Sequence, residues 1–333
     1  MGKLPKIIIA IGKYFGLDPA NGLSDEKTLW IDTLREVGVA EVFEYYYDTG
    51  DYDNTTRLIR TCVEINPDLL ILNSYDPNNP LYPDIYAISV VKKQLQIPII
   101  AFWYDATHHN FINSIRGVLP YIDLNITPDN PTFSFLTGSD LNLRERFTST
   151  VLPYNQNIYR NLNSNRDIPI SFMGQVDGHR SNRIPVLIKV MSAFPASYVS
   201  VLNRRDFMPY SHCLEIMQRS RMVLNFCDGA ELKQLKGRVF EAGYCGALVL
   251  EQANNEIDCF LRPMQDYVPW DTPEDLLEKI RYYLTHDDEY IKITENCQNR
   301  LKTVYGYKAF WRQIVDAIVR HSNIKASNER ILC

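Results

Sequence analysis

Short apolar runs recur along the chain and alternate with stretches that have the pattern of helices. In the first half, runs such as KIIIAI (residues 6–11) and DLLIL (residues 68–72) are uninterrupted, as expected of strands covered on both faces. The expected strands are Lys6–Ile11, Glu41–Tyr46, Leu69–Asn73, Ile99–Tyr104 and Leu124–Thr127, and the expected helices are Asp25–Val37 behind a Ser24 cap, Thr55–Ile65 and Asp84–Leu95. Because strands alternate with helices, this half predicts a parallel α/β sheet.

The alternation restarts beyond a polar stretch, RNLNSNRDIP (residues 160–169), whose Asn content and final Pro are typical of a linker. The second set of expected strands is Ile168–Met173, Val199–Leu202, Met222–Phe226 and Ala247–Leu250, with helices from about Asn182, near Ser211–Arg219, around Glu241 and from Pro273 to about Val319. A chain of 333 residues suits two domains. The prediction is an α/β chain with two Rossmann-like, doubly wound domains that face each other across a cleft.

The net charge, the cysteine content and the apolar runs limit which binding partners and which cellular location are expected. The net charge of −5 argues against general nucleic-acid binding, although a local basic pocket for a phosphorylated small molecule is compatible with it. The seven cysteines form no CxxC pair, so we expect neither a zinc site nor a disulfide framework, and a cytoplasmic location. No apolar run approaches the roughly 18 residues of a membrane span. We therefore expect no transmembrane segment, and peripheral contact with a membrane stays open.

One stretch, LKQLKGRVFEAGYCGALVLE (residues 232–251), combines cations, glycines and a carboxylate around an expected helix start. Lys236 and Arg238 can each give an anion a charge-assisted hydrogen bond of about 1.5–3 kcal/mol, and backbone amides at a helix start also attract anions. Glu241, one turn later, suits the hydroxyls of a ribose. This pattern predicts a nucleotide-sugar site, where Gly243 and Gly246 would pack close to the ligand. The alternative is a surface cluster in which Glu241 pairs with a cation of its own helix.

A second stretch, ISFMGQVDGHRSNR (residues 170–183), leads from an apolar strand into a glycine and two arginines. Gly174 allows a backbone to approach a ligand closely, and Arg180 and Arg183 can grip phosphate oxygens through two parallel hydrogen bonds. The alternative is a tight turn with two solvated arginines.

Together these motifs carry a family resemblance. The matching segments are FWYD (residues 102–105), ISFMGQVDGHRSNR, VLNF (residues 223–226), GRVFEAGYCGALVLE (residues 237–251) and DYVPWDTPEDLLEKIRYYLTHDDE (residues 266–289). In these the chain resembles the CgeB-like glycosyltransferases, of the spore-maturation-protein type, whose two-domain architecture is called GT-B. The resemblance implies an acceptor domain at residues 1–155, a nucleotide-sugar donor domain at 156–306, and a helix at 307–325 that crosses back to the first domain.

The resemblance also assigns roles to residues of the donor domain. It places Gly174 at the donor pyrophosphate with Arg180 or Arg183 nearby, Lys236 and Arg238 on the phosphates, and Glu241 on the ribose. Many related retaining transferases carry a second glutamate eight positions before this one, where Lys233 stands here, so the stereochemical outcome stays open. The chain has no clear Asp-x-Asp signature, which agrees with metal-independent transfer and with no cofactor besides the nucleoside-diphosphate sugar.

The acceptor side has its best candidates in FWYDATHHNF (residues 102–111). Asp105, His108 or His109 could take the proton of an acceptor hydroxyl, a step typically worth 10²–10⁴-fold in rate. Asp105 as a helix cap and the histidines as solvated loop residues are the alternatives, and Asp18 is a weaker candidate base. The aromatic residues Tyr45–Tyr47, Trp103 and Tyr104 could stack on sugar rings or pack in the core.

The expected function is therefore glycosyl transfer of the hexosyltransferase type, from a nucleoside-diphosphate sugar to an acceptor hydroxyl. The acceptor stays open between a glycan, a lipid-linked and a protein substrate. Two alternatives remain: a nucleotide-sugar epimerase of the same architecture, and a non-catalytic protein that binds a nucleotide sugar or polysaccharide.

Overall fold

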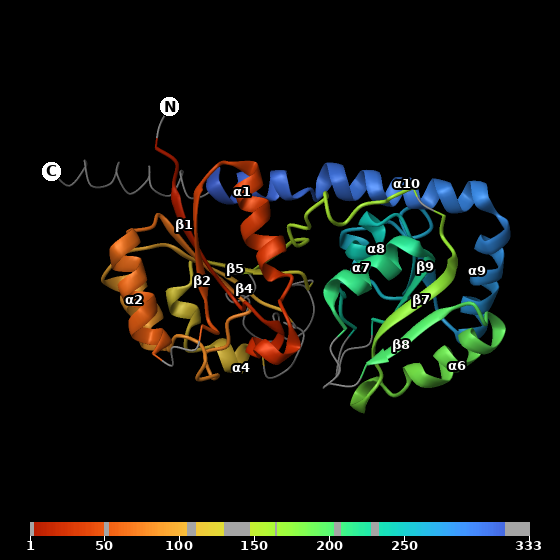
Figure 1. Cartoon of the computed structure of the whole chain (residues 1–333), viewed down its shortest axis with the longest axis horizontal. Helices are drawn as coiled ribbons and strands as arrows, with labels where there is room; N and C mark the ends of the chain where they lie inside the picture. The colour runs from red at the N-terminus through yellow and green to blue at the C-terminus, as the bar shows by residue number, and fades with distance from the viewer. Residues whose placement is uncertain are drawn as a thin grey trace. The chain divides into compact units, whose positions relative to one another are not determined.

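The computed structural model describes residues 3–49, 53–104, 111–129, 147–163, 165–202, 208–227 and 233–316. The chain divides into two compact units (Figure 1). The first unit contains residues 1–127, 131–155 and 307–333, and the second contains residues 128–130 and 156–306. The chain therefore leaves the first unit and returns to it at its end.

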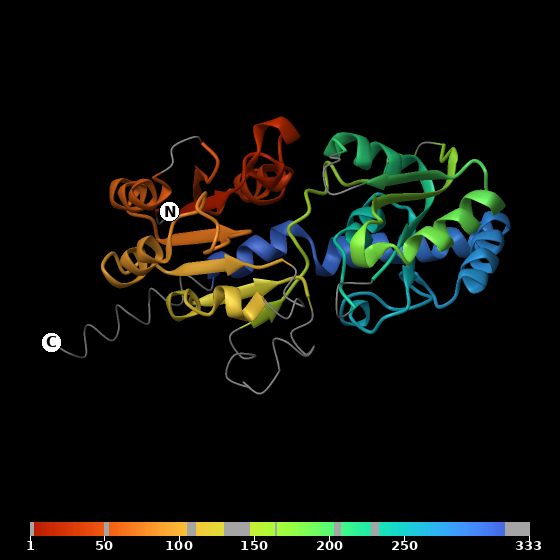
Figure 2. The ribbon, with the colours of Figure 1, turned by 90° about the horizontal axis from the view of Figure 1, so that it is seen from below.

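The first unit is built on a parallel sheet of six strands. These are β1 (Lys6–Ile11), β2 (Glu41–Tyr46), β3 (Leu69–Asn73), β4 (Ile99–Phe102), β5 (Leu124–Thr127) and β6 (Phe147–Ser149), in the spatial order β2-β1-β3-β4-β5-β6. Its helices include α2 (Asn54–Ile65), α3 (Ile85–Lys93) and α4 (Phe111–Ile115). Figure 2 shows the orange and yellow strands of this sheet side by side. The direction of strand addition reverses between β1 and β3, where ligands of such sheets collect.

The helix expected over residues 25–37 forms, but its first part has wider turns than expected. Residues Lys27–Asp32 are π-helical and continue into the α-helix α1 (Thr33–Val37). The Ser24 hydroxyl accepts a hydrogen bond from the Glu26 N–H at 3.2 Å, as expected of a cap. A sequence pattern with the period of an α-helix does not distinguish the wider turn, which is rare and frequent at functional sites.

The last described segment, residues 307–316, is helical and belongs to the first unit. The indole N–H of Trp311 donates to the Thr33 hydroxyl at 2.7 Å, and the Tyr307 hydroxyl donates to Glu36. The ring of Trp311 also lies edge-on to Trp30, with 5.9 Å between centroids. Figure 1 shows this blue helix beside α1.

The second unit repeats the strand order of the first. Its strands are β7 (Ile168–Gln175), β8 (Tyr198–Leu202), β9 (Ser220–Asn225), β10 (Leu248–Gln252) and β11 (Val268–Trp270), all parallel in the order β11-β10-β9-β7-β8. Its helices include α6 (Arg183–Ala193), α7 (Tyr210–Arg219), α8 (Arg238–Tyr244), α9 (Pro273–Thr285) and α10 (Asp287–Val304). In both units the order reverses between the first and the third strand, here β7 and β9.

The stretch expected to be a linker is fastened to the second unit. The guanidinium of Arg166 donates to the carbonyls of Ser220 at 2.5 Å and Cys245 at 2.6 Å, and β7 already begins at Ile168. The polar, Asn-rich composition therefore did not indicate that the half-buried Arg166 ties this stretch to the second unit. Across the described ranges, no helix combines the length and the apolar character that a membrane crossing requires.

Candidate functional site

A cavity of about 380 Å³ lies at the strand-order reversal of the second unit, and we call it the basic cavity. It is lined by Gly174, Gln175, Arg180, Arg183, Phe226, Lys236, Gly237, Arg238 and Glu241. Gly174 and Gln175 end β7, Phe226 follows β9, Arg180 lies in the turn before α6, Arg183 begins α6, and the others come from α8 and the segment just before it. The structure thus brings together all six residues that were predicted to hold the donor.

The two arginines after β7 are held in place by Gln175. Arg180 Nη1 donates to the Gln175 side-chain oxygen at 2.6 Å, and Arg183 Nη1 donates to the Gln175 backbone carbonyl at 3.0 Å. The Arg183 guanidinium also lies over the Phe226 ring, 5.3 Å from its centroid, and the residue is buried. A pair of solvated arginines, the alternative considered from the sequence, does not describe Arg183.

Arg238 is fixed by contacts on three sides. Its Nη1 donates to the Asn225 side-chain oxygen at 3.2 Å, and its guanidinium lies 5.7 Å from the centroid of the Phe172 ring. A Cβ on Gly174 would lie 3.0 Å from Phe172 Cζ, which is tight, and in ordinary contact, at 3.4 Å and 3.5 Å, with the two terminal nitrogens of that guanidinium. Burial lowers the pKa of Arg238, and the negative charges of Glu241 and Glu251 act against that shift. Gly174 therefore makes room for the Phe172 ring, over which the Arg238 guanidinium lies.

Glu251 is linked to Arg238 through the side chain of Asn225, and no role was predicted for it from the sequence. It is fully buried at the end of β10 and accepts hydrogen bonds from Asn225 at 2.6 Å and Asn254 at 3.0 Å. Burial raises the pKa of Glu251 to about 7, which these hydrogen bonds and the charges of Arg238 and Lys236 only partly offset. A charged residue inside an otherwise apolar strand was the available signal.

The remaining lining residues give the basic cavity its charge. The Lys236 ammonium donates to the Gln234 side-chain oxygen, and Glu241 is half-buried in the first turn of α8. Four cationic side chains and one carboxylate therefore line a single cavity. Converging cations of this kind favour a multiply charged anion such as a diphosphate.

The two glycines after Glu241 do not serve a ligand, which corrects the expectation from the sequence. A Cβ on Gly243 would lie 2.8 Å from Cys297 and Leu301 of α10, so this glycine allows α8 and α10 to pack closely. Gly246 has φ 77°, and a Cβ on it would clash with Asn161 and Arg166. Their roles are helix packing and a left-handed turn.

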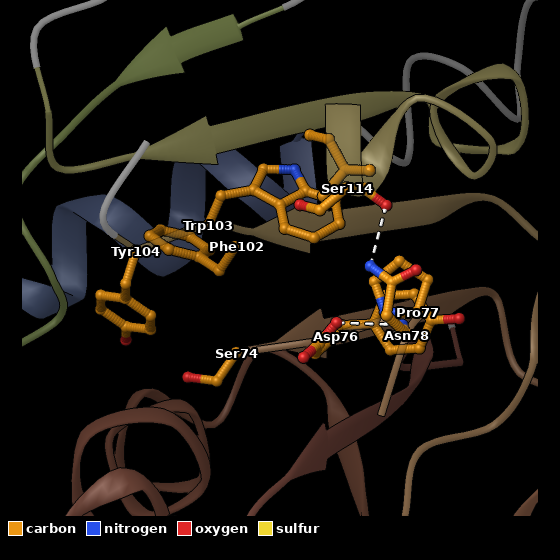
Figure 3. Close-up of a pocket in the computed structure, with 10 residues that line it drawn as sticks. Ser74, Asp76, Pro77, Asn78, Phe102, Trp103, Tyr104 and Ser114 are labelled. Carbon is orange, nitrogen blue, oxygen red and sulfur yellow. Dashed lines mark hydrogen bonds between the residues drawn. The ribbon is translucent and has the colours of Figure 1, made fainter. Parts of the chain in front are cut away.

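A second cavity, of about 350 Å³, lies within the first unit, and we call it the aromatic cavity (Figure 3). It is lined by Ser74, Tyr75, Asp76, Pro77, Asn78, Phe102, Trp103, Tyr104, Ser114 and Ile115, most of which follow the ends of β3 and β4. Figure 3 shows Ser74 and Tyr104 toward one end of it and Asp76 and Asn78 toward the other. Aromatic rings beside hydroxyl, carboxyl and amide groups are typical of sites that hold sugars.

The predicted acceptor-side residues have separate outcomes. Asp105, His108 and His109 lie outside the described residues, and their catalytic role stays a prediction. Trp103 and Tyr104 line the aromatic cavity. Tyr45 and Tyr47 are buried in the core of the first unit, and Asp18 is exposed and accepts a hydrogen bond from the Ala20 N–H at 2.9 Å, which places it as a turn cap. Over the described ranges, no three His, Cys, Asp or Glu side chains gather as metal ligands would.

Comparison with known proteins gives one family and several structures. A family described as "Glycosyl transferase-like" matches residues 156–316, just under half of the chain and nearly all of the second unit. No curated protein matches the sequence.

Three solved structures are similar over nearly the whole chain. The Anabaena protein HepE, in complex with UDP and glucose, has a TM-score of 0.65 at 11% identity and covers 95% of this chain and 100% of its own. An alpha-glucosyltransferase in complex with UDP and a 13-mer DNA containing an HMU base has a TM-score of 0.65 at 12% identity, covering 96% and 100%. A UDP-N-acetylglucosamine 2-epimerase has a TM-score of 0.58 at 13% identity, covering 97% and 97%. These likenesses establish the fold, which is GT-B with two Rossmann-like domains.

Proposed function

We propose that this chain is a glycosyltransferase that moves a sugar from a nucleoside-diphosphate sugar to an acceptor hydroxyl. One observation carries the proposal: four cations and one carboxylate, from segments far apart in the sequence, line one cavity at the strand-order reversal of the second unit. The match of residues 156–316 to a glycosyl transferase-like family supports it, as do the UDP ligands of two similar structures. UDP is therefore the first nucleotide to test.

In this proposal each lining residue has a separate task. Arg180, Arg183, Lys236 and Arg238 bind the diphosphate and stabilise the negative charge that develops on it as the sugar departs. Glu241 accepts hydrogen bonds from the ribose hydroxyls. Because four protein cations can supply this stabilisation, the proposal includes transfer without a metal ion. The acceptor occupies the aromatic cavity, whose rings and polar groups suit a sugar.

The finer assignments are also proposals. The CgeB-like type and the transfer of a hexose rest on the motifs in residues 99–319, and the cytoplasmic location rests on the cysteine content. A nucleic-acid acceptor is disfavoured by the net charge of −5.

A nucleotide-sugar epimerase is the second candidate, because a UDP-N-acetylglucosamine 2-epimerase shares the fold. The two activities differ in their products. Incubation with a panel of nucleotide sugars releases free nucleoside diphosphate if the chain is a transferase, and it interconverts the sugars if the chain is an epimerase. If the chain binds a nucleotide sugar but neither releases nucleoside diphosphate nor interconverts the sugars, the result supports a non-catalytic binding protein.

The basic cavity is tested by removing its cations one at a time. We expect Lys236→Ala and Arg238→Ala to weaken UDP binding roughly 10- to 150-fold each, since a charge-assisted hydrogen bond contributes about 1.5–3 kcal/mol. Isothermal titration calorimetry measures the dissociation constant, and thermal unfolding checks the fold. Lys189→Ala is the matched control, because it removes the same charge from an exposed site on α6. UDP binding that both cavity variants retain at wild-type strength would refute the assignment.

A further inference from the structure

Glu26 joins the two strand ends at the strand-order reversal of the first unit. Its carboxyl accepts a hydrogen bond from the Gly12 N–H at 2.9 Å and another from the Ser74 hydroxyl at 2.9 Å. Gly12 directly follows β1, and Ser74 directly follows β3. Ligands of doubly wound sheets bind at this reversal. The wide turns of residues 27–32 follow Glu26 directly, so this carboxyl sits at the start of an unusual helix.

Ser74 connects this carboxyl to the aromatic cavity. The residue is half-buried, and it lines the cavity together with Trp103 and Tyr104 (Figure 3). Its φ of 52° lies in the left-handed region, which is costly for a residue other than glycine and recurs at functional sites. The hydroxyl donates to Glu26 and accepts a long hydrogen bond from the Asn73 side-chain amide at 3.4 Å, so one lone pair of its oxygen can still accept from a bound molecule.

The surroundings of Glu26 suit a group that exchanges protons near neutral pH. Burial raises its pKa to about 7, and the neighbouring carboxyl of Asp25 acts in the same direction. The phenols of Tyr47, Tyr82 and Tyr104 are close enough for the charge of Glu26 to act on them. Burial is the main cause that raises their pKa values, so these phenols stay neutral at pH 7. The charge of Asp25 raises the pKa of Glu26, and burial raises the pKa of Asp25 itself to about 6. A base works best when its pKa is close to the working pH.

We propose that Glu26, acting through the Ser74 hydroxyl, receives the proton of the acceptor hydroxyl bound in the aromatic cavity. This inference rests on the proposed glycosyltransferase function and adds the route of the proton to it. Ser74 contacts the substrate, and Glu26 is the positioning residue that orients Ser74 and takes up the proton.

The step balances without any further reactant. The acceptor oxygen forms a bond to the anomeric carbon of the donor sugar as the bond from that carbon to the diphosphate breaks. The acceptor proton passes to the Ser74 oxygen while the Ser74 proton passes to the Glu26 carboxylate. The electron pair of the broken bond leaves with the diphosphate. Glu26 then returns its proton to solvent before the next cycle.

The test uses the full chain with UDP-glucose and other nucleotide sugars as donors and water as the acceptor, with the release of nucleoside diphosphate as the readout. We expect wild-type kcat to rise with pH around an inflection near 7. Glu26→Gln should lower kcat by roughly 10²–10⁴-fold and remove the inflection, with the UDP dissociation constant unchanged. A merely structural role for Glu26 would not remove a pH inflection.

Two substitutions at Ser74 separate chemistry from folding. Ser74→Ala and Ser74→Gly both remove the hydroxyl, but only glycine relieves the left-handed backbone, so Ser74→Gly should have the higher Tm. Equal loss of turnover in the two variants supports the proposal. Gln96→Gly is the control, because Gln96 is exposed with φ 56°, and it should raise Tm without changing turnover.

The outcomes distinguish this inference from the proposed function. If Glu26→Gln kept the turnover and the pH profile of the wild type, the proton route alone would be overturned. The same holds if turnover among the Ser74 variants rose and fell with their Tm. A wild-type chain that binds UDP but turns over no donor of the panel would overturn the transferase function, and the proton route with it.

Discussion

Asn225 links the guanidinium of Arg238 to the buried carboxyl of Glu251. Its side-chain oxygen accepts from Arg238 at 3.2 Å, and its amide nitrogen donates to Glu251 at 2.6 Å. An amide with its oxygen and nitrogen both engaged holds one orientation, and this fixes the cation that lines the basic cavity. Glu251 is therefore a candidate for positioning Arg238, although it does not line the cavity itself.

The raised pKa of Glu251 predicts a pH dependence of stability. The folded pKa, about 7, lies above the ordinary value of 4.5, so folding retains the proton. This contribution to stability is fully present below pH 4.5 and is lost as pH rises through 7. Glu251→Gln should remove that loss, so its stability relative to wild type should grow by on the order of 3 kcal/mol between pH 5 and 8.

Urea unfolding at several pH values measures this difference. Glu278→Gln, an exposed change on α9 of the same unit, is the matched control. Wild type and Glu251→Gln with parallel curves of unfolding free energy against pH would contradict the prediction.

At the scale of elements, the packing of α8 against α10 depends on one missing side chain. Gly243→Ala would place a Cβ 2.8 Å from Cys297 Sγ and Leu301 Cδ1. We expect a loss of about 1–3 kcal/mol in unfolding free energy, as for other overpacked cores. Chemical denaturation measures it. Adding Cys297→Ala should recover part of the loss, and a purely additive double variant would show that the contact is not responsible.

Most elements could be predicted from the sequence, because buried parallel strands appear as apolar runs with little else in them. The strands Lys6–Ile11, Glu41–Tyr46, Leu69–Asn73 and Leu124–Thr127 have the predicted bounds. The three-residue strands β6 and β11 were not predicted, since so short a run has no measurable period. The cations of the basic cavity were predictable because they cluster in two motifs.

Residues that act through tertiary contacts were beyond prediction. Glu26 stands in an ordinary helix start, and only the fold brings it to Ser74, 48 positions away. Glu251 lies in a strand, and Gly243 resembles a glycine beside a ligand until α10 is seen to pack on it. In each case the decisive partner is distant in sequence, and local patterns carry no information about it.

At the scale of the whole molecule, residues 307–316 pack onto the first unit after the chain has passed through the second. Trp311 is fully buried there and bonds to Thr33. Trp311→Ala should destabilise the first unit by about 3–5 kcal/mol, as removal of a buried aromatic side chain does. Hydrogen exchange should show faster exchange in β1 and α1 and unchanged protection in β7 and α8. Equal loss of protection in both units would contradict a role confined to the first.

This return of the chain has a consequence for biosynthesis. A ribosome releases residues in order, so β1 to β6 emerge long before the segment that covers Trp30 and Thr33. The second unit consists of residues 156–306 and a separate stretch of three residues, 128–130. It can finish folding while the first unit still exposes that apolar surface to chaperones. A chain that ends at Gly306 should therefore fold its second unit and leave Trp30 and Thr33 of the first unit uncovered.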